Sequence, residues 1–142
     1  MKLKFKKLNP EAAIPSFAHA GDSGMDVSAC ETVVVKARSF ALIKTGIAAI
    51  IPPGYEIQVR PRSGLQCKHG IVGAWGTVDE GYRGDIGVAL YNHTDEDYVV
   101  SKGARIAQLV LAPVVRPEIE ETDDLGEATE RGSSGFGSTG VM

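Results

Sequence analysis

Short apolar runs, separated by turn-forming residues roughly every ten positions, dominate most of the chain. The runs are rich in valine, isoleucine and tyrosine, which suit the pleated, half-buried surface of a β-sheet. No window keeps an amphipathic helical period for several turns, so long surface helices are not expected. The pattern predicts strands over residues 31–35, 40–44, 47–51, 55–60, 86–91, 97–100 and 105–111.

The segments between these runs carry the residue types that turns require. Pro52-Pro53-Gly54 and the stretch Asn92–Asp95 are strong turn signals, because such residues adopt turn conformations easily. Glycine accounts for 17 of the 142 residues, well above the usual ~7%. These features predict an all-β fold, a jelly-roll-like β-sandwich or barrel with one short helix and a flexible C-terminal arm.

Charge divides the chain unevenly. Residues 1–116 carry 14 lysines and arginines against 11 acids, whereas residues 117–142 carry one arginine and seven acids. An acidic run of this kind usually forms a solvated connector, and the basic excess elsewhere is too small for stable nucleic-acid binding. The sequence therefore predicts three parts: a β-domain over 1–113, an acidic tether over 114–130 and a Gly/Ser-rich lid over 131–142.

Length and cysteine spacing indicate how many domains the chain forms and in which compartment it is expected. A chain of 142 residues fits one domain with a real hydrophobic core, and it has no apolar run long enough to span a membrane. The N-terminus lacks the apolar stretch of a secretory signal. Cys30 and Cys67 have neither metal-site nor CxxC spacing. We therefore expect free thiols in a soluble, intracellular protein, cytoplasmic or nuclear.

The segment 60–68 has features of a phosphate site. Ser63 and Gln66 form an S-x-x-Q capping box, which predicts a short helix beginning at Ser63. The start of a helix presents free N–H groups that suit a phosphate, and the neighbouring Arg62 offers a forked donor. A capped helical turn with a surface arginine explains the same residues.

The segment 76–84 holds a candidate general base. Asp79 follows the apolar Val78 and precedes turn residues, so its carboxylate is expected at the rim of a pocket. Tyr82 is placed to stack on a sugar. A plain hairpin-like loop remains the alternative.

Two further segments carry polar groups among strand-like residues. Asp22 and Asp26, in a Gly/Asp loop, are suited to position a hydrated cation or an arginine, or else form an ordinary turn. Gln108 interrupts an apolar strand and must find hydrogen-bond partners, either a ligand phosphate or the neighbouring backbone.

The last candidate segment is the Gly/Ser-rich stretch 131–140. Its backbone N–H groups are able to form an anion-binding nest, with Arg131, Ser138 and Thr139 as further donors. It lacks the Gly-Lys-Ser/Thr ending of an NTPase phosphate loop. A disordered linker is the alternative, but such a linker does not need Phe136, an aromatic ring able to stack on a base.

Taken in order, these five segments closely resemble the motifs of the trimeric, all-β dUTP pyrophosphatase (dUTPase) family. The resemblance spans nearly the whole chain and rests on 20–26, 61–65, 76–84, 103–109 and 131–140. It implies hydrolysis of dUTP to dUMP and pyrophosphate, which keeps uracil out of DNA and supplies dUMP for dTMP synthesis. It also implies Mg²⁺ carried on the triphosphate, and a homotrimer whose active sites are shared between subunits.

The resemblance assigns roles residue by residue. It implies that Asp79 activates the attacking water and that Asp26 organises the site near the phosphates and the metal-bound water. Val78 belongs to the hairpin that holds uracil and deoxyribose, Tyr82 excludes a 2′-hydroxyl, and Phe136 stacks on uracil. Phosphate contacts are implied for Arg62, Ser63, Gly64 and Gln108. The terminal loop that closes over the triphosphate is implied for Arg131, Gly137, Ser138 and Thr139.

The sequence also departs from the family pattern. Gly73 stands where many relatives carry asparagine, so uracil recognition there must use backbone or water. Trp75 replaces a common proline, Ala104 an aspartate and Gly87 a lysine found in some relatives. Both Gly73 and Gly87 are kept as substrate-binding candidates.

Two other functions remain open. A dCTP deaminase shares the fold and nucleotide class but needs a glutamate base in its pocket, and the Asp79–Tyr82 pattern fits dUTPase better. A catalytically silent nucleotide-binding module is the second. No direct protein ligand for Mg²⁺ is expected, because this ion is usually held by phosphate oxygens and water.

Overall fold

The computed structural model describes residues 1–140, which form eleven β-strands and one short α-helix. In chain order these are β1 (Lys4–Lys7), β2 (Met25–Ser28), β3 (Val33–Val35), β4 (Phe40–Ile43), β5 (Ile47–Ile50), β6 (Tyr55–Arg60), α1 (Ser63–His69), β7 (Ile71–Gly73), β8 (Gly76–Val78), β9 (Val88–Asn92), β10 (Tyr98–Val100) and β11 (Arg105–Pro113).

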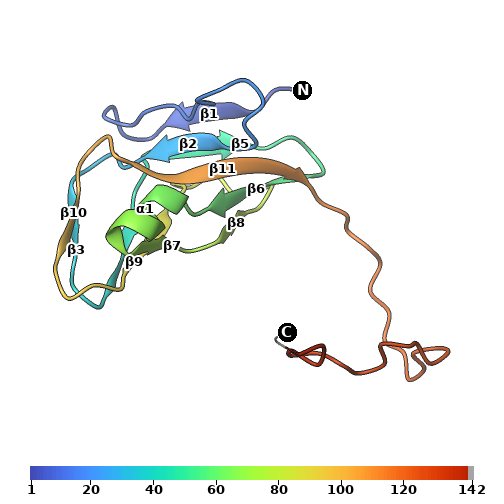
Figure 1. Cartoon of the computed structure of the whole chain (residues 1–142). Coiled ribbons are helices and arrows are strands. Elements are labelled where there is room, and N and C mark those ends of the chain that lie inside the picture. Colours follow the sequence, from blue (N-terminus) through green and yellow to red (C-terminus); the bar gives the residue numbers. More distant parts are fainter. Residues whose placement is uncertain (141–142) are drawn as a thin grey trace.

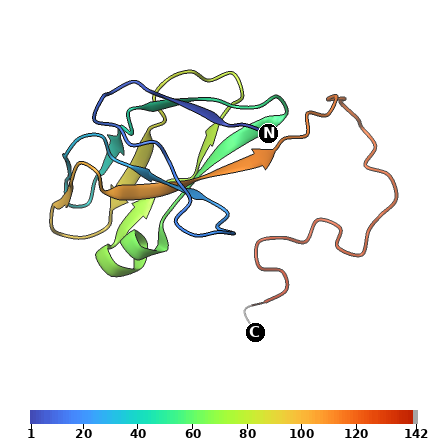
Figure 2. The ribbon, with the colours of Figure 1, turned by 90° about the horizontal axis from the view of Figure 1, so that it is seen from above.

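The strands pair in four antiparallel sheets. The largest has the order β2-β11-β6-β8, and a second has the order β4-β9-β7. Two strand pairs, β1-β5 and β10-β3, complete the body. Figure 1 shows α1 in front of β7 and β9, with β11 running across the body to the point where the C-terminal tail leaves it. Figure 2 shows the same body from above, with the tail arching away from it.

Alternation along the strands builds the core between the two larger sheets. In β6, Ile57 and Val59 are buried while Glu56, Gln58 and Arg60 are less buried, as expected when successive side chains point to opposite faces. The core includes fully buried residues from both sheets, namely Ile43, Leu90, Ile57 and Leu109. The predicted β-rich fold with one short helix is therefore confirmed, but the sheets of the described chain do not close into a barrel.

Four strands were not expected from the sequence. Strand β1 has a single apolar residue among three lysines, and β7 and β8 are only three residues long. Strand β2 lies in the Gly/Asp segment, where turn residues hide its short apolar alternation. Short strands carry too few positions for a period-two pattern to stand out.

The helix forms where expected, but its capping was predicted wrongly. Ser63 is the first helical residue, and the N-cap is Arg62 in an extended conformation with no side-chain cap hydrogen bond. The S-x-x-Q signature therefore does not operate as a capping box here. Gly70 ends the helix with a φ of 65°, a left-handed conformation that glycine adopts without strain.

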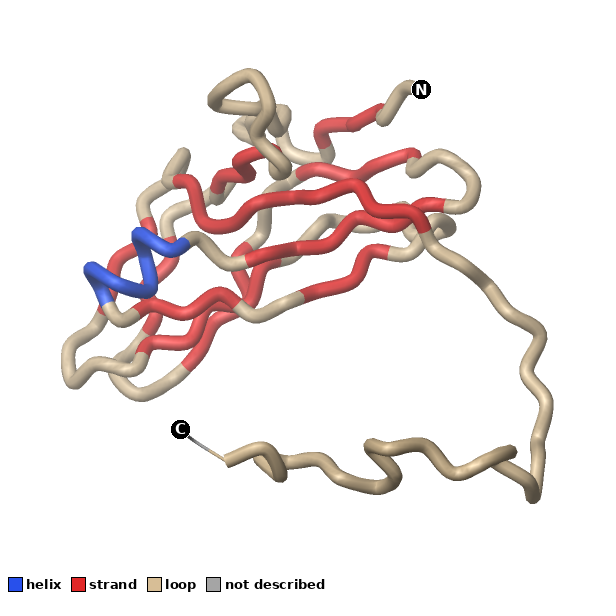
Figure 3. Tube along the Cα trace, turned by 45° about the vertical axis from the view of Figure 1, so that its right-hand side comes forward, coloured by secondary structure: helices blue, strands red, loops and turns tan. Residues whose placement is uncertain are grey.

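The tail beyond β11 has no helix or strand between Val114 and Gly140 (Figure 3). The predicted lid extends to residue 142, and its last two residues lie outside the described residues. Nowhere in residues 1–140 is a helix long and apolar enough to cross a membrane.

Candidate active site

A cluster of charged groups surrounds Asp26 on β2. Its carboxylate lies 3.4 Å from Nε of Arg62 and 3.2 Å from Nη1 of Arg105. Arg62 also donates a hydrogen bond of 3.2 Å to the carbonyl of Arg105. Because the Asp26 side chain is only 17% exposed, the two guanidinium groups are held by a carboxylate that is well shielded from water. Asp26 therefore sets the positions of two cations.

A β-bulge in β11 brings two of these groups to one face. Opposite β2, Arg105 pairs with Ser28, Ala107 with Val27 and Gln108 with Asp26, so the register shifts between 105 and 107. In a regular strand, residues three positions apart point to opposite faces. The extra residue of a bulge changes that relation, and Arg105 and Gln108 line the same pocket.

This cluster pocket has a volume of about 460 Å³. Besides Asp26, it is lined by four residues that the sequence singled out as phosphate contacts, Arg62, Ser63, Gly64 and Gln108. The side-chain amide of Gln108 makes no hydrogen bond within residues 1–140, so its groups are free for a ligand. Gly24 permits this packing, because a Cβ there would lie 2.9 Å from Oε1 of Gln108.

A second pocket, of about 450 Å³, lies beside β8 and the loop that follows it. Its lining includes Gly76, Val78, Asp79, Tyr82 and Gly87, together with Leu42 and Lys44. A Cβ at Gly87 would lie 2.8 Å from Cδ1 of Leu42, so the glycine allows this close approach. Apolar groups form most of its lining. The predicted hairpin is not formed in the described chain, because β8 and the next strand, β9, belong to different sheets.

The loop 79–85 holds its polar groups by internal hydrogen bonds. The Tyr82 N–H donates to the carbonyl of Asp79 at 3.0 Å, and the Tyr82 hydroxyl donates to the carbonyl of Asp85 at 2.8 Å. The ring lies close over Gly84, where a Cβ would be 2.5 Å from the hydroxyl oxygen. In the described chain, the Asp79 carboxylate itself accepts no hydrogen bond and is exposed. It is therefore available as a base at the pocket rim.

Two carboxylates anchor this loop to the rest of the body. Asp85 accepts hydrogen bonds from the N–H groups of Thr45 and Gly46, at 3.1 and 3.0 Å. Glu80 accepts a 2.9 Å bond from the Gly54 N–H and forms a 3.1 Å ion pair with Arg116. The Gly54 N–H, and after it the Arg116 guanidinium, hold the pKa of Glu80 below its ordinary value.

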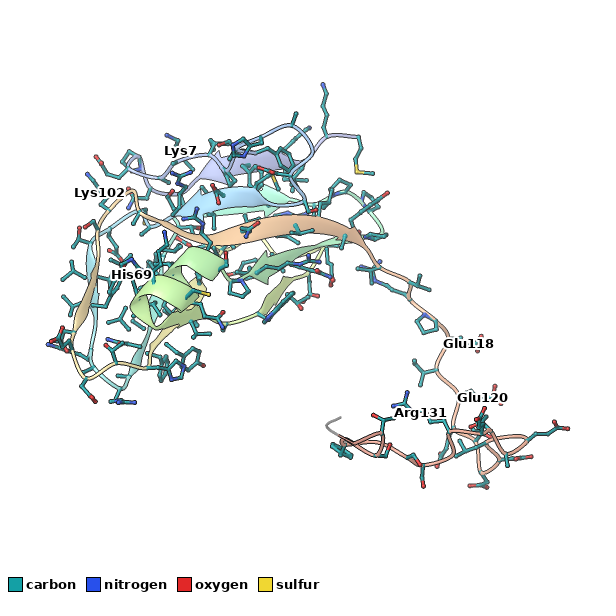
Figure 4. The ribbon with its side chains drawn as sticks, viewed as in Figure 1. Lys7, His69, Lys102, Glu118, Glu120 and Arg131 are labelled. Carbon is teal, nitrogen blue, oxygen red and sulfur yellow. The ribbon has the colours of Figure 1, made fainter. Side chains whose placement is uncertain are left out.

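Other predicted site residues lie elsewhere. Gly73 lines neither pocket and is buried in β7, where a Cβ would lie 3.3 Å from Pro61. The tail residues Arg131, Phe136, Gly137, Ser138 and Thr139 line a hollow formed by the tail alone. Figure 4 shows Glu118, Glu120 and Arg131 on the tail, away from the sheets. Arg105, Leu42, Lys44, Asp85 and Glu80 were not anticipated.

The two pockets lie at opposite corners of the large sheet. Asp26 is level with Gln108 and Arg60, whereas Asp79 follows Val78, which pairs with Ile57. At ~3.3 Å per residue and ~4.8 Å per strand, four residues and three strand spacings separate Asp26 from Asp79 by roughly 20 Å. One protomer therefore does not bring its own Asp79 to its own cluster.

Neither pocket is a protein metal cage. Within residues 1–140, no group of three or more His, Cys, Asp or Glu side chains is placed to hold a metal ion. Cys30 is buried and Cys67 exposed, and both are free thiols. The cluster pocket is lined by two carboxylates, Asp22 and Asp26, and by two arginines, Arg62 and Arg105. This mixture fits a metal that arrives on phosphate oxygens better than one held by protein ligands alone.

Comparison with known proteins identifies clear relatives. The family model "dUTPase" matches residues 10–140. A deoxyuridine 5'-triphosphate nucleotidohydrolase from Gloeothece citriformis is 52% identical, covering 99% of this chain and 98% of that protein, and one from Nautilia profundicola is 51% identical, covering 99% of both. The solved structure of the Staphylococcus bacteriophage 80alpha dUTPase with dUPNHPP superposes with a TM-score of 0.92 at 34% identity, covering 99% of each chain. A mutant dUTPase from phage phi11 of S. aureus, described as coordinating a structural Mg(II) ion, superposes with a TM-score of 0.83 at 28% identity, covering 88% of this chain and 99% of that one.

Proposed function

The chain belongs to the dUTPase family, and on that premise we propose that it hydrolyses dUTP to dUMP and pyrophosphate with the two pockets described above. The observation that carries the residue roles is the grouping of Arg62, Ser63, Gly64 and Gln108 around Asp26. This activity removes dUTP before it enters DNA and supplies dUMP for dTMP synthesis.

Asp79 is the general base in this proposal. Its carboxylate is exposed, lies at the rim of the pocket beside β8 and accepts no hydrogen bond from the described residues. It is free to take a proton from a water molecule that attacks the α-phosphorus, provided that the water lies within hydrogen-bond reach of about 2.6–3.2 Å. The turn closed by the Tyr82 N–H fixes the backbone from which Asp79 projects.

The pocket beside β8 selects the nucleoside. The backbone around Gly76, Val78 and Gly87 offers donors and acceptors to uracil, and a cytosine amino group would be badly paired there. Tyr82 is held by its hydrogen bond to Asp85, so its ring is a fixed surface beneath the deoxyribose that leaves no room for a 2′-hydroxyl. Gly73 acts in this scheme only through its backbone or water.

The cluster binds the triphosphate. Arg62 and Gln108 offer side-chain donors, and Ser63 and Gly64 add N–H groups from the first turn of α1. Mg²⁺ bound to the triphosphate oxygens and water would neutralise phosphate charge, and Asp26 is the carboxylate able to accept a hydrogen bond from its water. Charge neutralisation and positioning are the main needs of this reaction.

A complete site requires more than one subunit. An attacking water must contact both its base and the phosphorus, so a separation of roughly 20 Å between Asp79 and the Asp26 cluster is too large for one protomer to serve both. A closed homotrimer with shared sites satisfies this requirement. The tail would complete each site, with Phe136 on uracil and Arg131, Gly137, Ser138 and Thr139 over the phosphates. The expected location is where dUTP forms, in the cytoplasm or nucleus.

A product assay tests the reaction. The protein is incubated with Mg²⁺ and either dUTP or dCTP, and pyrophosphate and ammonia are followed. Pyrophosphate from dUTP alone is expected, whereas ammonia from dCTP would indicate a deaminase. Release of neither product would indicate a silent nucleotide-binding module.

A mixing experiment tests the shared site. Asp79→Asn impairs the pocket and Arg62→Ala impairs the cluster, so each variant alone is expected to be nearly inactive. After unfolding and refolding together in equal amounts, about one quarter of sites should combine an intact pocket with an intact cluster if subunits assemble at random. Activity no higher than that of the separately refolded variants would rule out sharing.

A further inference from the structure

The tail is tied to the body immediately beside the carboxylate assigned as the base. The Val114 N–H donates a 2.8 Å hydrogen bond to the carbonyl of Gly54, and Arg116 pairs with Glu80. From 117 to 140, the tail forms hydrogen bonds only with itself. Arg116 is therefore the last described residue that holds the tail to the body, and its partner directly follows Asp79.

Glu80 is fixed through both its side chain and its backbone. Its carboxylate receives the Gly54 N–H at 2.9 Å and Arg116 at 3.1 Å, and its carbonyl receives Nη1 of Arg83 at 2.8 Å. The same Gly54 donates to Glu80 and accepts from Val114. These contacts join the β5–β6 turn, the loop 79–85 and the start of the tail at one point.

The Asp79 carboxylate has no comparable support of its own in the described chain. Its orientation depends on the backbone between β8 and Tyr82, and Glu80 is the next residue along that backbone. We propose that Glu80 is a positioning residue for Asp79, and that Arg116 couples this positioning to the point where the tail leaves the body. The inference rests on the proposed role of Asp79 as the base.

The charges and the exposed fractions of Glu80 and Arg116 suit a role in positioning Asp79. Glu80 is ionised at neutral pH like any ordinary glutamate, and the Gly54 N–H and Arg116 lower its pKa further, so its pair with Arg116 persists there. The two side chains are 34% and 59% exposed, and ion pairs of this kind contribute little to stability. A displacement of about 1 Å at a reacting group, in contrast, is able to cost ~10²-fold in rate. The pair should therefore affect turnover more than folding.

The test uses full-length variants of the Glu80–Arg116 pair and, as a control, a variant of a second surface ion pair. Glu80→Gln keeps an acceptor for Gly54 but loses the charge, Arg116→Ala removes the partner, and Arg116→Lys restores the charge. Lys36→Ala is the control, because Lys36 and Asp97 form an exposed pair of 2.9 Å. Steady-state kinetics on dUTP and hydrogen exchange of the loop 79–85 are measured for each.

We expect Glu80→Gln and Arg116→Ala each to lower kcat by about tenfold, with KM changed by less than about twofold, because neither residue lines either pocket. The double variant should be no slower than the worse single variant, since both act through one contact. Arg116→Lys should recover much of the loss. Exchange in the loop should accelerate in both single variants and not in the control.

Unchanged loop exchange in Arg116→Ala would overturn the coupling, whatever reaction the wild-type protein catalyses. Faster exchange with unchanged kcat would overturn the positioning role. Additive losses in the double variant, or an equal loss in Lys36→Ala, would also contradict it. If the wild-type protein released no pyrophosphate from dUTP, the proposed function itself would fail, and the exchange data would still decide whether Arg116 holds the loop.

Discussion

The cluster around Asp26 and the pocket around Asp79 give their carboxylates opposite surroundings. Asp26 is largely shielded and lies between two arginines from different segments of the chain. Asp79 is exposed and accepts no hydrogen bond within the described chain. The first arrangement positions cations, whereas the second leaves a base free to accept a proton. Each carboxylate has the surroundings that its proposed task requires.

Substitutions in the two regions should therefore have different effects on the protein. In the cluster, the side chains hold one another, so removing one charge disturbs the others and weakens phosphate binding. In the pocket, the loop is held by hydrogen bonds that do not involve the Asp79 carboxylate. Removing that carboxylate should leave the pocket intact. Effects on binding and effects on turnover should therefore separate between the two regions.

The largest effect is expected for Asp79→Asn. Asparagine keeps the shape of the side chain but cannot take the proton of the attacking water, so kcat should fall by about 10²–10⁴-fold. Affinity for dUTP should change little, because the loop contacts do not use the carboxylate. Single-turnover kinetics and equilibrium binding of a non-hydrolysable analogue measure the two quantities separately. A variant with near-wild-type kcat would show that Asp79 is not the base.

Removal of residues 131–142 should have the next largest effect. The described part of this segment contacts neither pocket, so the melting temperature should stay nearly unchanged. The rate at low dUTP concentration should fall by about 10²-fold if the segment closes over the triphosphate. Phe136→Ala should reproduce part of that loss. A truncated protein that melts many degrees lower, or works normally, would contradict the lid assignment.

Of the strands predicted from the sequence, β6 matches its observed bounds most closely. Strand β6 was predicted with its observed bounds because Ile57 and Val59 alternate with polar residues. The strand predicted at Ile86 begins at Val88, although Ile86 is itself buried. Strand β1 escaped prediction because its pairing with β5, rather than its own composition, makes it a strand. Pairing partners far apart in the chain are not visible in a local pattern.

Most cluster residues could be predicted because short motifs carry them, but Arg105 and the arrangement of the cluster could not. Arg105 joins Gln108 at the cluster through the β11 bulge, and a period-two pattern gives no sign of a bulge. Glu80 contacts Gly54 and Arg116, which lie 26 and 36 positions away in the chain. Gly73 is a predicted uracil contact from its place in a motif, and its packing against Pro61 is a separate constraint that the sequence does not show.

The smallest effect is expected for Asp26→Asn, which tests whether the cluster depends on orientation or on charge. Losing the carboxylate should let Arg62 and Arg105 turn away, raising KM for dUTP by about tenfold, or about 1.4 kcal/mol, with a smaller change in kcat. Asp26 also repels the triphosphate, so a lower KM in the variant would show that its charge outweighs its positioning of the arginines. Asp95→Asn is the control, because Asp95 pairs with Arg38 at 2.7 Å on the surface and lines neither pocket. Its kinetics should match those of the wild-type protein.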